Sequence, residues 1–369
     1  MMIDDIKILP ADAEAMARAK KRWDSVSKPK NSLGDLEELI VRIAGAQGTE
    51  NIDISRRVAV VFAADNGIVA ERIAQSSPDL TAGVAVHIAN GRGNINTMGR
   101  AAGCDVICVD VGIDSRYLPA RPREMVDLHV MDGTRNFLEG TAMSDAEARK
   151  AFRAGLLMSD RISEKGIGIA AAGEMGIGNT TTSAAVIAAL LNIEPREIVG
   201  RGAGLDDIGL ARKIDVVRRG LLGFGLTAAD GEVSPENAWR VLCAVGGLDI
   251  AAMAGFYTGC ASHHIPVVLD GLISAAAALA AVYMNKNVRD YLIASHIGRE
   301  AGTSAVLSEL GLKAVLHADM ALGEGTGAVL LFPLLDVMAA EYNSALTFDD
   351  MGFVSDDEAV DGIRVFMRR

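Results

Sequence analysis

One stretch, AAAGEMGIGNTTTSAAVIAALL over residues 170–191, constrains the fold more than any other part of the chain. It begins as the end of a buried strand, passes three glycines within six residues and continues as an apolar helix. Glycines let backbone N–H groups converge in such a turn, and the next helix directs its free N–H groups and positive dipole end to the same point. The pattern predicts a strand-loop-helix unit that binds a phosphate. A corner whose glycines serve packing alone is the alternative.

Two further apolar runs predict buried parallel strands. RVAVVFAA at 57–64 and DVICVDV at 105–111 are continuous rather than alternating, as strands covered on both faces should be. Helical patterns alternate with them, so the fold class is α/β with a doubly wound, mostly parallel sheet. Ligands of such sheets bind at the carboxyl ends of the strands. Two helical patterns precede the first strand, and Ser32 is the expected N-cap of the second.

Composition excludes several functions. A net charge of −12 and a pI near 5.0 argue against a nucleic-acid partner, which clustered Lys and Arg would bind. The longest apolar run, 267–284, contains Asp270 and is shorter than the ~20 apolar residues of a membrane helix. The N-terminus lacks the apolar core of a signal peptide, so we expect a cytoplasmic protein without membrane contact. The four cysteines show no metal spacing, and neither a metal nor a cofactor is expected.

A second glycine loop, VGRGAGLDD at 199–207, precedes a helix that carries Arg212 and Lys213. Basic residues after a glycine loop would complement the anion site, although a surface turn with solvated charges fits equally well. Glu174 and Glu324 are each isolated between glycines, in GEMG and GEGTG. Flanking glycines free the backbone to present a carboxylate to a pocket, where it can act as a general base.

Six phrases of the chain resemble the nicotinate-nucleotide:dimethylbenzimidazole phosphoribosyltransferase family, which activates the lower ligand of cobamides. They stand in family order and span roughly residues 24 to 350: KPKNSLGDLEEL, VFAADNGIVAE, DVGID, GEMGIGNTTTSA, VGRGAGLDD and LGEGTGAVLLFPLL. The resemblance implies transfer of phosphoribose from nicotinate mononucleotide to an aromatic base, which releases nicotinate. It also implies a Rossmann-like α/β domain over residues 51–310 and a smaller helical domain formed from both chain ends, 1–50 and 311–369. A homodimer, or a heterodimer with a related chain, would place the sites near the interface.

The resemblance assigns roles to individual residues. Glu324 matches the catalytic base, and Glu174 the second acidic residue of the site. The phosphoribose would be bound by Gly176, Gly178, Asn179, Thr180, Arg201, Gly202, Gly204 and Lys213, and the aromatic base by Asp65, Ser77, Gly83 and Leu322.

The chemistry of the implied reaction fits two carboxylates. Nicotinate leaves as a neutral pyridine, so the leaving group needs little acid assistance, whereas the acceptor becomes a nucleophile only as its proton departs. One carboxylate would take that proton, and a second would stabilise positive charge at the anomeric carbon. We assign the first role to Glu324 and the second to Glu174.

Departures from the family pattern concern the acceptor. Gly83 stands where many relatives have a glutamine that contacts the base, and SHIGREAG at 295–302 replaces the usual SHxSxEPG. A different benzimidazole, a purine or a phenol such as p-cresol is therefore an alternative acceptor, the last in a pair of related chains. A catalytically silent subunit is a further alternative, against which the retention of both glutamates argues. An α/β sugar-phosphate enzyme of other chemistry is a more distant one.

Overall fold

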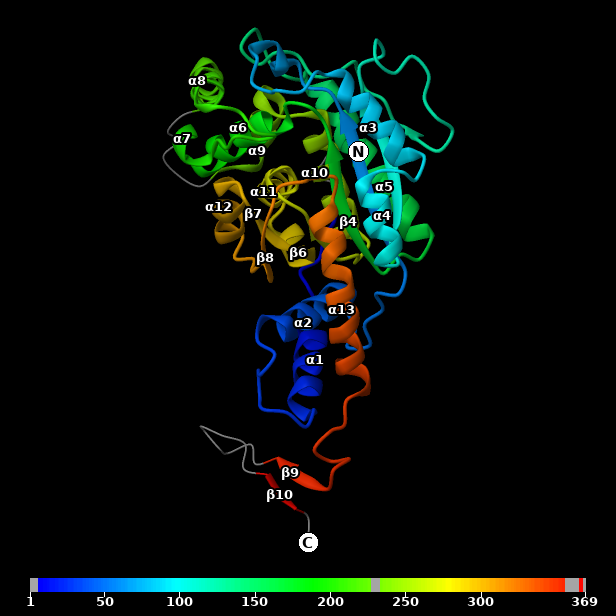
Figure 1. Ribbon diagram of the computed structural model, residues 1–369. Helices are drawn as coiled ribbons and strands as arrows, with labels where there is room; N and C mark the ends of the chain where they lie inside the picture. Colours follow the sequence, from blue (N-terminus) through cyan, green and yellow to red (C-terminus); the bar gives the residue numbers. More distant parts are fainter. Residues whose placement is uncertain (1–5, 227–232, 356–364, 368–369) are drawn as a thin grey trace.

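A computed structural model of the protein describes residues 6–226, 233–355 and 365–367. Its centre is a sheet of six parallel strands in the order β3-β2-β1-β4-β5-β6 (Figure 1). The predicted α/β class with a doubly wound parallel sheet is confirmed. The strands are β1 (Arg57–Ala64), β2 (Asp105–Gly112), β3 (Val126–Asp127), β4 (Ile169–Met175), β5 (Val267–Leu269) and β6 (Leu292–Ala294).

The strand order fixes where a ligand can enter. From β1 the chain adds β2 and β3 on one side, and from β4 it adds β5 and β6 on the other. The order therefore reverses between β1 and β4, and the crevice of a doubly wound sheet opens beyond the carboxyl ends of the strands at such a reversal. The loop after β4 is the glycine-rich stretch from which the fold was predicted.

Alternate residues of the strands bury two separate hydrophobic cores, because successive side chains of a strand point to opposite faces. Val58, Val60 and Phe62 of β1 belong to one core, while Ala59 and Val61 belong to the other. The first core contains residues of α5 (Asp145–Glu164), α6 (Asn179–Leu191), α9 (Pro235–Val245), α10 (Leu248–Ser262) and α11 (Leu272–Met284), and the second those of α1 (Ala13–Ser25), α2 (Asp35–Gln47), α3 (Asp79–Ala89), α4 (Asn94–Ala101) and α13 (Thr326–Ser344).

Helices from both chain ends pack together below the sheet, where α1 and α2 lie beside the lower half of α13 (Figure 1). The rings of Trp23 and Tyr342 meet edge to face at 5.1 Å, and Val26 forms an antiparallel bridge with Thr347. The domain bounds at residues 50 and 310 stay a prediction. None of the described helices is long and apolar enough to cross a membrane.

The start of α2 differs from the prediction. Its N-cap is Gly34, at φ 58°, rather than Ser32. The buried Glu37 carboxylate accepts hydrogen bonds from Lys28 Nζ at 2.6 Å and from the Leu33 amide at 3.1 Å. These bonds satisfy the turn before the helix, so the helix begins two residues later than a serine cap would start it.

The remaining elements connect these layers. A short parallel pair, β7 with β8, lies next to the loop that carries Glu324, and the sequence analysis did not predict it. The other elements are η2 (Gly67–Glu71), α7 (Pro195–Ile198), α8 (Asp207–Gly223), η3 (Lys286–Tyr291), β7 (His296–Gly298), α12 (Ala301–Glu309), β8 (Leu316–Met320), β9 (Phe353–Ser355) and β10 (Val365–Met367).

Candidate active site

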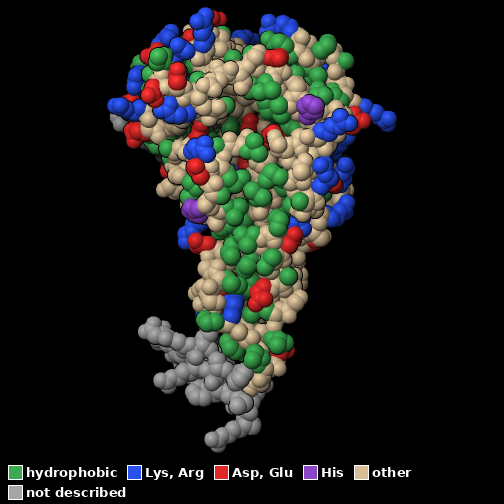
Figure 2. All heavy atoms as spheres, viewed as in Figure 1, with side chains coloured by type: hydrophobic (Ala, Val, Ile, Leu, Met, Phe, Trp, Pro, Cys, Tyr) green, Lys and Arg blue, Asp and Glu red, His purple; other side chains and the backbone are tan. Residues whose placement is uncertain are grey.

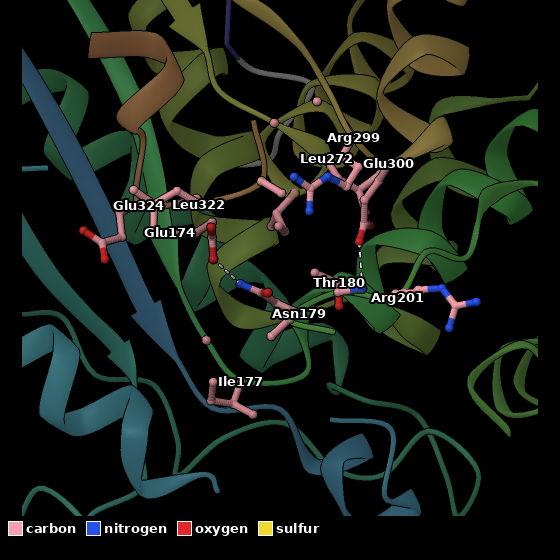
Figure 3. A pocket seen from close by; sticks show the side chains of 18 of the residues that line it. Glu174, Ile177, Asn179, Thr180, Arg201, Leu272, Arg299, Glu300, Leu322 and Glu324 are labelled. Atoms are coloured by element: carbon pink, nitrogen blue, oxygen red, sulfur yellow. Dashed lines mark hydrogen bonds between the residues drawn. The ribbon is translucent and has the colours of Figure 1, made fainter. Parts of the chain in front are cut away.

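A cavity of about 300 Å³ opens beyond the carboxyl end of β4, between the start of α6, the loop before α8 and the loop before α13 (Figure 3). The structure brings most of the predicted site residues to this one space. Those that line it are Glu174, Gly176, Gly178, Asn179, Thr180, Arg201, Gly202, Gly204, Lys213, Leu322 and Glu324.

The turn between β4 and α6 requires its glycines. A Cβ on Gly176 would lie 2.4 Å from the carbonyl oxygen of Ala64, so only glycine lets the turn pass the end of β1. Gly178, the N-cap of α6, has φ 95°, a left-handed conformation that favours glycine. Asn179 then places its side-chain amide inside the cavity wall, where it donates to Glu174 and, at 3.0 Å, to Asp249 Oδ2.

Two buried carboxyl groups thus share one amide donor. Burial, with a further contribution from the charges of Asp249 and Asp270, raises the pKa of Glu174 to about 8. Burial likewise raises the pKa of Asp249 to about 6. Glu174 is therefore mainly protonated at neutral pH in the free protein, and positive charge that enters the cavity favours its ionisation.

Glu324 sits on a strained backbone. Its φ is 62°, which residues other than glycine rarely adopt, and Gly323 and Gly325 on either side have φ 83° and 91°. Outliers of this kind cluster at functional sites because the surrounding structure must hold them in place. Gly173 permits the close approach of the loop, since a Cβ there would lie 2.2 Å from the carbonyl oxygen of Glu324.

The buried Asp270, just after β5, anchors this loop. Its carboxylate accepts from the amides of Gly325 at 3.1 Å and Gly327 at 2.7 Å, at the start of α13. The first amides of α13 are therefore already bound to the Asp270 carboxylate. The Glu324 side chain turns toward the first turn of α4, where it accepts from Asn94 Nδ2 and from the Ile95 amide, both at 3.2 Å. Figure 3 shows the carboxyl groups of Glu174 and Glu324 pointing in different directions from neighbouring parts of the wall.

Lys213 supplies a buried cation on the opposite wall. Its side chain is 1% exposed and donates to Thr180 Oγ1 at 2.7 Å, and burial lowers its pKa to about 8. Gly202, at φ 54°, brings the second glycine loop against this pair, because a Cβ there would lie 3.4 Å from Lys213 Nζ. We call Thr180, Gly202 and Lys213 the anion cradle. Arg201 turns away from it and donates to the Leu205 carbonyl at 2.9 Å and to Asp207.

The chain is similar to proteins of known name over nearly its whole length. A family model described as a phosphoribosyltransferase matches residues 8–353. A protein of Geobacter sp. (strain M21), named nicotinate-nucleotide-dimethylbenzimidazole phosphoribosyltransferase, is 38% identical over 349 residues, 95% of this chain and 97% of its own length. A protein of the same name from Desulforamulus reducens is 41% identical over 348 residues, covering 94% and 96%. The chain belongs to this family.

Solved structures agree with the membership. The crystal structure of CobT from Thermus thermophilus has a TM-score of 0.85 and 39% identity, and the match covers 92% of this chain and 98% of that one. A second crystal structure from the same organism, titled as the nicotinate-nucleotide-dimethylbenzimidazole phosphoribosyltransferase, has a TM-score of 0.84 and 38% identity, with the same coverage of 92% and 98%. The resemblance predicted from the six phrases is confirmed, and the chain is an enzyme of the phosphoribosyltransferase type.

Three residues predicted to contact the aromatic base do not line the cavity. Asp65 is buried and accepts from the Asp114 amide at 2.9 Å, so it ties together the loops after β1 and β2. Ser77 and Gly83 are exposed, and a Cβ on Gly83 would meet nothing within 4 Å. Leu322 does line the cavity and is 55% exposed. Their roles toward the base stay a prediction.

The structure adds site residues that the sequence analysis missed. Asp249 and Asp270 hold the two glutamate loops, as described above. Further polar side chains line the same cavity, among them those of Ser274, His296, Glu300 and Thr303. Within the described part of the chain, no group of three His, Cys, Asp or Glu side chains is placed to hold a metal ion.

Replacing Glu174 by glutamine is expected to stabilise the protein at alkaline pH. The folded chain prefers the protonated carboxyl group, whereas the unfolded chain ionises near the ordinary value of 4.5. The free energy of unfolding of the wild type therefore falls as the pH rises from about 4.5 to about 8. The glutamine variant has no proton to lose at this position, so it does not undergo this fall. Chemical unfolding at pH 5 and pH 8 should show an advantage of the variant that grows with pH to the order of 2 kcal/mol. The control variant Glu164→Gln, at an exposed position, should show no such advantage. An advantage of Glu174→Gln that does not change with pH would contradict the raised pKa of Glu174.

Proposed function

We propose that the chain transfers the phosphoribosyl group of nicotinate mononucleotide to 5,6-dimethylbenzimidazole and releases nicotinate and α-ribazole phosphate. The observation that carries the proposal is one cavity that combines the anion cradle with two glutamates, Glu174 and Glu324. The names of the relatives described above support this donor and this acceptor.

The anion cradle would bind the 5′-phosphate of the donor. Lys213 contributes a positive charge, the start of α6 contributes its dipole, and Thr180 contributes a hydroxyl group. Fixing the phosphate fixes the ribose, so the anomeric carbon comes to lie near Glu174 at the end of β4. Orientation of this kind supplies much of the rate of a group transfer.

Glu174 would stabilise the positive charge of the donor and of the transition state. The pyridinium of the donor and the oxocarbenium-like carbon of the transition state both favour ionisation of a neighbouring carboxyl group. Glu174 would therefore give up its proton as the donor binds and then stabilise the transition state by its charge. As the bond between the anomeric carbon and nitrogen breaks, its electron pair goes to the nitrogen, and nicotinate leaves as a neutral pyridine.

Glu324 would act on the acceptor. One nitrogen of dimethylbenzimidazole gives its lone pair to the anomeric carbon, and the other nitrogen loses its proton to the Glu324 carboxylate. This requires the side chain to leave the donors of α4, Asn94 and Ile95, and to rotate into the cavity. The proton acceptor and the charge stabiliser are thus two separate carboxyl groups, held by separate loops.

The direct test incubates the purified chain alone with nicotinate mononucleotide and dimethylbenzimidazole, and identifies products by chromatography and mass spectrometry. We expect nicotinate and α-ribazole phosphate in equal amounts. Adenine and p-cresol serve as competing acceptors in parallel reactions. Transfer to p-cresol with none to dimethylbenzimidazole would contradict the proposed acceptor, and no release of nicotinate with any acceptor would contradict the reaction.

We also propose that the chain forms a homodimer through α13. The outer face of this helix exposes large apolar side chains, since Leu330 is 42% and Val337 is 64% exposed. Figure 2 shows hydrophobic side chains gathered over this part of the molecule, from below the upper body down to its narrow lower part. Extended apolar surface of this kind marks protein interfaces, and symmetric dimers are the commonest assembly. Sedimentation equilibrium should give twice the chain mass, and a monomer at micromolar concentration would contradict the proposal.

A further inference from the structure

Glu300 reaches into the anion cradle from α12, whose N-cap it is. Its Oε1 accepts a hydrogen bond from the Gly202 amide at 2.9 Å. The loop closes tightly around this carboxylate, because a Cβ on Gly200 would lie 2.7 Å from the Glu300 Cδ. Figure 3 shows the Glu300 side chain directed across the cavity toward the loop beside Thr180.

The carboxylate occupies a position that suits an anion in general. It accepts a hydrogen bond from the Gly202 amide, and its negative charge favours the protonated form of the buried Lys213. The Lys213 ammonium donates its own hydrogen bond to Thr180. The second oxygen, Oε2, is buried and has no hydrogen-bond partner. One oxygen is thus held by the cradle, while the other is left without the partner that a permanently buried carboxylate would need.

We propose that Glu300 is a displaceable substitute for the substrate phosphate: its carboxylate fills the cradle in the free protein and is pushed aside when a phosphate enters. The proposal rests on the proposed function, because the cradle is taken there as the site of the 5′-phosphate. A phosphate dianion and a carboxylate cannot share the Gly202 amide, and their like charges repel at this distance. The side chain has to leave, or the phosphate binds weakly.

Displacement has a consequence for the catalytic cycle. Substrate and product carry the same phosphate, so the Glu300 charge weakens the binding of both. A carboxylate that returns to the cradle competes with the product phosphate and favours its release. Glu300 would in this way prevent a strong cation site from retaining the product.

The decisive variant is Glu300→Gln, which keeps an oxygen acceptor for the Gly202 amide and removes only the charge. Calorimetric titration with inorganic phosphate at pH 6.5, well below the pKa of about 8 of Lys213, should show binding about tenfold tighter than in the wild type. The KM for nicotinate mononucleotide should fall with it, whereas kcat should stay level or decrease because the product leaves more slowly. Glu309→Gln removes the same charge from the exposed end of α12, next to Tyr283, and should leave all three values unchanged.

A purely structural role of Glu300 predicts a different pattern. If its task were only to hold the Gly202 loop, glutamine would conserve that bond and phosphate affinity would not change, while Glu300→Ala would bind phosphate more weakly. Equal or weaker phosphate binding by a folded Glu300→Gln variant therefore overturns the proposal, and its thermal unfolding confirms that it is folded. A wild type and a variant that both fail to bind phosphate overturn it as well.

Failure of the proposed function gives a separate result. Tighter phosphate binding by Glu300→Gln, in a protein that transfers nothing from nicotinate mononucleotide, would support the role of Glu300 and contradict only the reaction. Transfer by the wild type with no gain in phosphate affinity would support the reaction and contradict only the role of Glu300.

Discussion

Replacing Glu324 by glutamine is expected to lower kcat by roughly 10²-fold or more, with little change in the binding of nicotinate mononucleotide. Glutamine has nearly the same shape and can still accept a hydrogen bond from the Ile95 amide, so the strained loop keeps its conformation. It cannot take a proton from the acceptor base. The defect should therefore appear in kcat and hardly at all in the KM of the donor.

Steady-state kinetics with both substrates measure this split. Glu341→Gln is the matched control, because it removes one charge from an exposed position of the same helix, α13. Its turnover should equal that of the wild type. A Glu324→Gln variant with near wild-type turnover would show that another group takes the proton and would remove the main support for the proposed mechanism.

Replacing Lys213 by methionine is expected to raise the KM for nicotinate mononucleotide by about 10- to 100-fold. Methionine fills the buried volume but provides no charge and no hydrogen-bond donor. The binding of inorganic phosphate, measured by calorimetry, should weaken by a similar factor. The control variant Arg212→Met also removes one positive charge, from the neighbouring exposed residue of α8. It should change the KM and the phosphate affinity little.

The pH dependence supplies an independent check on Lys213. Since burial lowers its pKa to about 8, the ammonium loses its proton as the pH rises through that value. Phosphate affinity of the wild type should fall between pH 7.5 and pH 9.5, a range in which inorganic phosphate is mainly the dianion. Lys213→Arg should remove this decline, because guanidinium stays charged throughout. A decline of equal size in both proteins would show that a different group titrates.

The fold and the centre of the site were predictable because their signals are local. The turn from β4 to α6 is encoded within ten residues, and the apolar runs of β1 and β2 are typical of parallel strands covered on both faces. Once the sheet is parallel, the carboxyl ends of its strands share one edge, which places Glu174 at the ligand crevice. Glu324 follows a strand of a separate sheet, and it was expected in the same site from the family resemblance. Leu316–Met320 could not be recognised as a strand, because it is short, largely exposed and shows no alternation.

The supporting residues could not be predicted, because each acts on a partner distant in the chain. Asp249 meets Asn179, Asp270 meets Gly327, and Glu300 meets Gly202. An aspartate or glutamate near a helix start has many ordinary explanations, and only the folded chain shows which donor it reaches. Conversely, the resemblance to the family placed Ser77 and Gly83 beside the base, but in the folded chain they do not line the cavity.

Helix α13 links two distant parts of the molecule. It starts at the loop that carries Glu324, and it ends where Tyr342 packs on Trp23 of the N-terminal helix. Nineteen residues of continuous helix form a rod of about 28 Å. Because one helix joins these two parts, the packing of Tyr342 on Trp23 supports, from below, the helix start that follows Glu324.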